Sequence, residues 1–152
     1  MNEVKVTEDW HVERLGSTMN REDVDAVRAM ADMGPHDALT SSVDHSTKSF
    51  TWLADGDVGC IWGYSSETYL STSAQPWMLG SPLIMKNPRY FLRGCRQFYD
   101  LLLDRHELLY NYIDARHTRS LRWIEWLGAT VHPAAPIGVA GMPFHLHETR
   151  RK

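Results

Sequence analysis

The segment 117–131, "HTRSLRWIEWLGATV", decides how this chain is interpreted. It predicts a short amphipathic helix, because an apolar face recurs at the spacing i, i+3, i+4, i+7. That face is formed by Ser120, Trp123, Ile124 and Leu127. Asp114 or Thr118 can cap the start of the helix, and Gly128 supplies the left-handed residue that ends it before a strand. The polar Ser120 at the start of the apolar face fits either core packing or contact with a ligand.

The other helices and strands are predicted from the spacing of apolar residues and from residues that favour turns and helix ends. Asp55-Gly56 between two apolar runs predicts a β-hairpin, and Asn87-Pro88 opens the longest helix. The predicted strands are 3–7, two within 48–66, 75–85, 107–114, 129–132 and 141–148, and a proline-broken link covers 133–136. The predicted helices are 8–19 (ending near Gly16), 21–34 (ending before Gly34), 35–46, 88–106 and 117–128.

This order predicts one α+β (mixed α/β) domain over residues 1–152, with a mostly antiparallel central sheet flanked by helices. The strand–helix–strand unit at 75–113 adds one parallel crossover, because a long helix separates its two strands.

Composition narrows the classes of partner and compartment. The 152 residues carry a formal net charge of −3, so no overall field attracts nucleic acid or an anionic membrane. The two cysteines, Cys60 and Cys95, lie in unrelated contexts, which favours a reducing compartment. Neither a signal peptide nor an apolar run of membrane-spanning length is visible, so we expect a cytoplasmic protein.

Basic residues gather at the start of the helix 88–106, where the helix dipole is already positive. They are Lys86, Arg89, Arg93 and Arg96. An anion bound at the free N–H groups would favour this arrangement, since helix N-termini bind phosphate. The same charges also fit a solvated face with pairs such as Arg96–Asp100.

The residues give little support to metal or nucleophilic chemistry. His145 and His147 alternate along a predicted strand and could join Cys60, Cys95 or Glu148 in a zinc site. No CxxC or HExxH spacing occurs, so we expect two surface histidines and no metal. No GxSxG, P-loop or GxGxxG motif is present.

Element order and the segment 117–131 together resemble the GCN5-related N-acetyltransferase (GNAT) superfamily. Its late motif places Asn before a helix, a small residue three positions later and Gly-Phe at the end. His117, Ser120 and Gly128 occupy the first three of those positions, and Ala129 replaces the Phe. "NYIDARHTRSLRWIEWLGATVH…GMPFH" also resembles, more closely, a family of T7-like tailed phages that includes an internal virion protein. This closer match covers roughly residues 88–147.

The resemblance implies an acyl-CoA-dependent N-acetyltransferase with acetyl-CoA as its cofactor. Lys86, Arg89 and Arg93 would then hold phosphates, His117 and Ser120 would contact the cofactor, and strands 75–84 and 108–113 would splay around its pantetheine arm. Glu67 or Asp114 could serve as the base through water.

Two family features are replaced in this sequence. The glycine-rich phosphate turn corresponds to "PLIMKNPRYF", which has no glycine, and the frequent tyrosine acid corresponds to Ile124. A second hypothesis therefore stands beside the enzyme: a non-catalytic phage virion or assembly protein, located in the particle or the host cytoplasm. It would associate with other proteins through tryptophans such as Trp62, Trp77 and Trp126.

Overall fold

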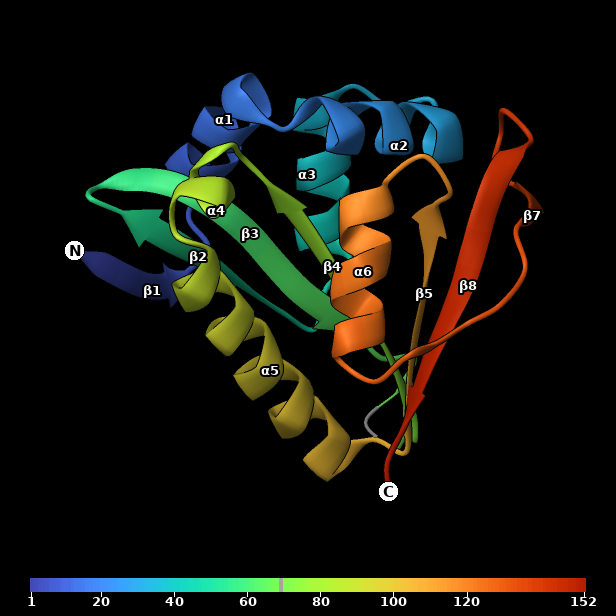
Figure 1. The fold of residues 1–152 in the computed structure, drawn as a ribbon. Helices are drawn as coiled ribbons and strands as arrows, with labels where there is room; N and C mark the ends of the chain where they lie inside the picture. The colour runs from blue at the N-terminus through green and yellow to red at the C-terminus, as the bar shows by residue number, and fades with distance from the viewer. Residues whose placement is uncertain (69) are drawn as a thin grey trace.

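The computed structural model describes residues 1–68 and 70–152, and in them one sheet of eight strands lies between two layers of helices (Figure 1). The strands are β1 (Asn2–Val6), β2 (Lys48–Ala54), β3 (Asp57–Ser65), β4 (Ser73–Gly80), β5 (Leu108–Asp114), β6 (Thr130–Val131), β7 (Ala135–Ile137) and β8 (Met142–Arg150). The helices are α1 (Asp9–Thr18), α2 (Arg21–Ala31), α3 (Pro35–Asp44), α4 (Leu83–Lys86), α5 (Pro88–Arg105) and α6 (Thr118–Trp126).

Strand order in the sheet is β1-β2-β3-β4-β5-β8-β6, and β7 pairs with β8. Every pairing is antiparallel except that of β4 with β5. The predicted fold class and its single parallel crossover are therefore confirmed.

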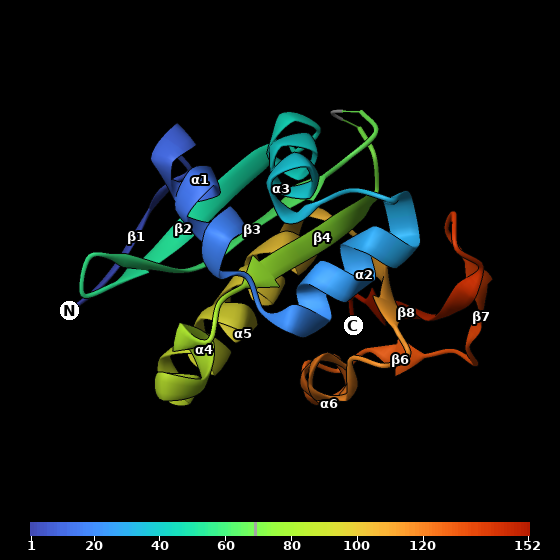
Figure 2. The ribbon, with the colours of Figure 1, turned by 90° about the horizontal axis from the view of Figure 1, so that it is seen from above.

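Helices α1, α2 and α3 cover one face of the sheet, and α4, α5 and α6 cover the other (Figure 2). On the first face Leu15 and Leu39 are fully buried against strand residues such as Ile61. On the second face Leu102 and Ile124 pack around Leu109. Within the described residues, no helix is long and apolar enough to cross a membrane.

Turn chemistry explains the hairpin between β2 and β3. Asp55 and Gly56 both adopt positive φ, at 50° and 82°, as a two-residue type I′ turn requires. The predicted hairpin is confirmed.

Three predicted boundaries are wrong for local reasons. The strand predicted over 75–85 ends at Gly80, because the buried Ser81 accepts a hydrogen bond from the N–H of Leu83 and starts the short helix α4. Helix α2 ends at Ala31, where Asp32 rather than Gly34 takes the left-handed conformation (φ 53°). The link predicted over 133–136 contains the first residues of β7, which adds to β8.

Candidate active site

The opening between β4 and β5 is the feature that the fold builds into the middle of its sheet. The strands pair only at Ser73–Leu108 and Ala74–Leu109, and then separate toward their C-terminal ends (Figure 1). In a parallel pair, every second residue of a strand bonds to the neighbouring strand through its N–H and C=O groups. The first bond between these strands runs from the N–H of Leu108 to the C=O of Thr72 (3.2 Å). To continue the pairing, residues 74 and 76 of β4 would each have to donate an N–H to β5. Residue 76 is proline and has no N–H. Pairing therefore cannot continue past it.

Asn111 completes the separation by inserting its amide between the strands. Its Nδ2 donates to the carbonyl of Pro76 (2.7 Å), and its Oδ1 accepts from the backbone N–H of Tyr112 (2.7 Å). Gln75 Nε2 donates to the same Oδ1 (3.1 Å). The side chain thus satisfies backbone groups that face each other across the gap and holds β4 and β5 apart.

A backbone donor of β4 faces this opening. The carbonyl of Pro76 and the N–H of Gly80 both bond away from β3, to Asn111 and Asp23 respectively. Because backbone groups alternate between the two edges of a strand, the N–H and C=O of Met78 lie on that same edge. Met78 therefore presents a hydrogen-bond donor to whatever enters the opening.

Asp23 spans the mouth of the opening from α2. Its Oδ2 accepts from the N–H of Gly80 at the end of β4 (2.9 Å), and its Oδ1 lies 2.9 Å from Nε2 of His117, just beyond β5. Asp23 and His117 are 6% and 7% exposed. Asp23 lies in the first turn of α2, and no motif in the sequence singles it out. Its partners come from distant segments, so only the assembled sheet reveals the site.

His117, and not Asp114 or Thr118, caps α6. Its Nδ1 accepts from the N–H of Ser120 (3.4 Å), which places the ring proton on Nε2, where it is donated to Asp23. The hydroxyl of Ser120 lies 3.1 Å from the same Nε2. The structure thus brings together the predicted residues His117 and Ser120 and adds Asp23 to them.

The predicted phosphate residues follow the same C-terminal end of β4, in α4 and the start of α5. Lys86 ends α4, and Arg89 and Arg93 follow in the first two turns of α5; all are exposed. The N–H groups of Ile84, Met85 and Asn87 donate within the turn that replaces the glycine-rich loop. Any phosphate held here would therefore be held by cationic side chains more than by backbone groups.

Aromatic and cationic contacts join α5 to α6. The rings of Phe91 and Trp123 lie 4.7 Å apart. Arg96 donates to the carbonyls of Trp126 (2.8 Å) and Leu127 (3.2 Å) at the C-terminus of α6. Arg96 is therefore a helix cap, where the sequence suggested an anion ligand or a pair with Asp100.

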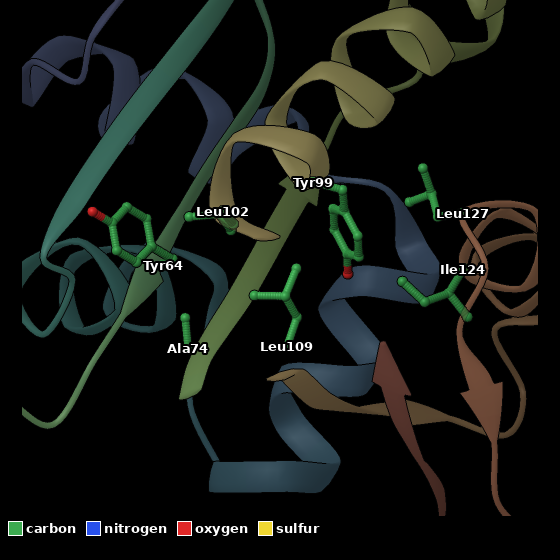
Figure 3. Packing of buried hydrophobic residues seen from close by; sticks show 7 residues of the cluster. All are labelled: Tyr64, Ala74, Tyr99, Leu102, Leu109, Ile124 and Leu127. Carbon is green, nitrogen blue, oxygen red and sulfur yellow. The ribbon is translucent and has the colours of Figure 1, made fainter. Parts of the chain in front are cut away.

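A phenol lies beside the position where the resemblance expects a tyrosine. Ile124 is buried, and Figure 3 shows the ring of Tyr99, from α5, between Ile124 and Leu109. Burial, with a smaller contribution from Cys95, raises the pKa of Tyr99. Its hydroxyl therefore keeps its proton at neutral pH. Alignment with the family motif could not reveal this residue, because it lies on a different helix.

A cavity of about 610 Å³ lies between α2 and the β7–β8 connection. Two carboxylates and two guanidinium groups contribute charge to its lining: Asp25, Asp32, Arg28 and Arg116. Two of them are chain neighbours of the cluster, since Asp25 follows Asp23 by two residues and Arg116 precedes His117. The connection is fixed to α2 by the N–H groups of Val139 and Ala140, which donate to the last turn of α2 at 3.1 and 3.2 Å.

The two carboxylates suggested as bases have other surroundings. Glu67 is exposed in the connection after β3. Asp114 is buried and accepts from the guanidinium of Arg116 at 2.7 and 3.0 Å. Burial raises the pKa of Asp114, but the side-chain and backbone hydrogen bonds from Arg116 outweigh it, so the pKa is lowered overall. These contacts favour a structural role for Asp114.

The histidines of β8 differ from the surface pair that was predicted. His147 is 3% exposed, and desolvation lowers its pKa to about 4. Its Nδ1 has no hydrogen-bond partner in the described part of the chain. Within residues 1–68 and 70–152, no group of three or more His, Cys, Asp or Glu side chains is arranged to hold a metal.

The predicted surface tryptophans are only partly at the surface. Trp126 is 51% exposed. Trp62 packs against Phe50 and Phe98, and Trp77 donates to the hydroxyl of Ser46 (2.7 Å). Trp126 alone of these three offers an open ring, and the guanidinium of Arg96 covers one side of it.

Solved acetyltransferase structures share this architecture. Spermidine N-acetyltransferase from Vibrio cholerae, in complex with CoA and spermine, has a TM-score of 0.72 and 11% identity, covering 99% of this chain and 95% of that one. An N-acetyltransferase from Staphylococcus aureus Mu50 has a TM-score of 0.71 and 10% identity over 100% and 99%. An acetyltransferase of the GNAT family from Streptococcus pneumoniae has a TM-score of 0.67 and 8% identity over the full length of both chains.

No protein-family model matches the sequence, and no curated protein matches it either. Identities this low show the fold alone. The splayed strands, the helix layers and the agreement over whole chains establish that this protein has the GNAT acetyltransferase fold.

Proposed function

We propose that the protein is an acyl-CoA-dependent N-acetyltransferase that acts in the opening between β4 and β5. The observation that carries the proposal is the way Pro76 and Asn111 hold the two strands apart while leaving the Met78 N–H facing the gap. A protein that used the fold only as a scaffold would have no need for these devices, since closing the ladder would satisfy the same backbone groups.

The residues around the opening fit acetyl-CoA in part. The gap offers an edge along which an extended pantetheine arm could pair, and Lys86, Arg89 and Arg93 offer positive charge for phosphates. The turn at α4 uses its own N–H groups and so supplies less backbone binding than a glycine-rich loop. Acetyl-CoA, when bound, would supply an acyl thioester.

Each proposed role belongs to a group of this chain. With an acyl thioester bound, the N–H of Met78 would donate to the acyl carbonyl oxygen and stabilise the charge that develops there. Asp23, which already accepts hydrogen bonds from Gly80 and His117, would accept the proton of the attacking amine through a free lone pair. Tyr99 would supply a proton to the departing sulfur, in place of the phenol missing at Ile124.

The cavity beside α2 fits the acceptor. Its residues adjoin Asp23 and His117 in sequence, and its charged lining is balanced, because Asp25 and Asp32 stand beside Arg28 and Arg116. We propose a primary amine as the substrate class. Polyamines are the first candidates, because one structural neighbour carries spermine.

A thiol-release assay with acetyl-CoA and a panel of primary amines tests this function. Asp23→Asn is expected to lower kcat/KM by about 100-fold, the usual contribution of a positioned base, and Tyr99→Phe by about tenfold or more. Asp25→Asn is the matched control on the same helix and should mainly raise KM. No thiol release with any amine would overturn the proposal.

The second candidate is the non-catalytic phage virion or assembly protein, with protein partners in the particle or the host. It is favoured by the sequence resemblance at 88–147 and by the replacement of the phosphate turn with α4. It predicts that neither CoA nor acetyl-CoA binds and that a partner is recovered from phage particles.

A further inference from the structure

We infer that β1 is a self-association edge, through which two copies of this chain join their sheets into one continuous sheet. The two ends of the sheet differ in a way that points to this. At one end, β6 has only two residues and is followed by Pro133 and Pro136, which is how proteins usually protect an edge. At the other end, β1 has five residues, all exposed, and contains no proline.

The backbone groups on the outer side of β1 can be identified from its pairing with β2. The N–H of Asp55 donates to the carbonyl of Met1, and the N–H of Thr7 donates to the carbonyl of Ser49. Hydrogen-bonded pairs alternate along an antiparallel pair of strands, so the odd-numbered residues of β1 are the ones whose N–H and C=O groups bond to β2. The N–H and C=O groups of Asn2, Val4 and Val6 therefore face outward.

A two-fold axis at Val4 satisfies all of these outward groups. Antiparallel pairing centred there matches Val4 with the Val4 of a second copy, and Asn2 with its Val6. Every outward group then finds a partner. The Val4 side chains, 51% exposed in the single chain, would pack against each other across the axis.

Charge selects this register over its neighbours. With the axis at Val4, Glu3 of each copy lies opposite Lys5 of the other. Shifting the pairing by two residues in either direction would place Glu3 opposite Glu3 or Lys5 opposite Lys5, which is unfavourable. Lys5 also lies 3.2 Å from Glu8, but that pair is exposed and competes only weakly. The partner that fits this edge is therefore a second copy of the same chain.

The test is sedimentation velocity on the full chain from about 10 µM to about 1 mM, a range that covers weak association. The wild type should shift from monomer to dimer. Glu3→Lys and Lys5→Glu should each weaken the dimer about tenfold, because each puts like charges opposite each other twice. The double variant Glu3→Lys/Lys5→Glu exchanges the pair and should restore dimerisation.

Two further variants separate this edge from other surfaces. Val4→Pro removes an outward N–H without removing a bond to β2, and should abolish the dimer. Glu13→Lys makes the same charge change at an exposed site on α1 and should leave the dimer unaffected. A wild type that stays monomeric throughout, or a dimer that survives Val4→Pro and both single charge reversals, would overturn the inference.

Discussion

The two edges of β5 show opposite behaviour. On the side of β8 it is paired along its whole length, from Leu108 with Arg150 to Asp114 with Phe144. On the side of β4 it is paired at Leu108 and Leu109 only. One strand therefore contributes to a continuous sheet on one side and to an open site on the other. The difference comes from two residues, Pro76 and Asn111, and not from any weakness of the strand itself.

The largest loss of stability should come from a substitution at Leu109, a core residue of β5 that pairs with both β4 and β8. Leu109 is fully buried and is the last residue of β5 to pair with β4. Leu109→Ala should lower the free energy of unfolding by about 4 kcal/mol, through lost burial and the cavity left behind. Leu101→Ala, at a side chain that is 65% exposed, is the matched control and should change it little. Chemical denaturation followed by circular dichroism measures both, and equal losses would contradict the packing described.

The strand that pairs with β5 on its closed side, β8, should make the stability of the protein depend on pH. His147 in β8 is buried and neutral, with a pKa of about 4 against 6.5 for a free histidine. Between these values the unfolded chain binds more protons than the folded one, so the free energy of unfolding falls as pH falls. The loss should approach about 3 kcal/mol at pH 4.

The variant His147→Leu isolates this histidine from the other titrating groups. Denaturation midpoints between pH 7 and pH 4 should fall less steeply for the variant than for the wild type. Parallel profiles would show that the pKa of His147 is not lowered in the folded protein.

The open edge can be closed by design. Asn111→Ala leaves the Pro76 carbonyl and the Tyr112 N–H without the side chain that bridges them, and should cost about 2 kcal/mol. Adding Pro76→Ala restores a backbone donor, so the strands can pair directly and part of the loss should be recovered. A double-mutant cycle measures this coupling, and strictly additive losses would contradict the proposed cause of the opening.

The smallest effect should appear where β5 ends. Arg116 lowers the pKa of Asp114 against the opposing effect of burial, so the stability it contributes is present at neutral pH and is lost as pH falls through the lowered pKa. Arg116→Gln should reduce the free energy of unfolding at pH 7 only slightly, because the guanidinium is half exposed and water screens the pair. Its acid unfolding should begin at a higher pH than that of the wild type. An unchanged acid limb would mean that the pair contributes nothing.

Much of the fold could be predicted, because turn residues and the spacing of apolar residues within short segments determine many of its elements. Asp55-Gly56 identifies its hairpin, and Pro88 with the apolar stripe of α5 identifies the longest helix. The strand end at Gly80 was missed, because the hydrogen bonds of Ser81 to β3 decide it and no local propensity does.

The site could be predicted only in part, for the same physical reason. His117 and Ser120 belong to one helix start, so a motif could identify them together. Asp23 meets His117 across 94 positions of sequence, and Asn111 meets Pro76 across 35. Tyr99 reaches Ile124 from another helix. Such contacts depend on the assembled sheet.

Binding of acetyl-CoA to the wild type and to Pro76→Ala/Asn111→Ala is the most direct test of the central claim, that the opening between β4 and β5 is a cofactor site. Thermal melts with acetyl-CoA and with CoA should show a raised Tm for the wild type, equivalent to about 2.7 kcal/mol at a hundred times the Kd. Arg89→Glu should reduce that rise, and the double variant, with its strands closed, should show none. An unchanged midpoint for the wild type at millimolar cofactor, or a rise that the double variant retains, would contradict the account.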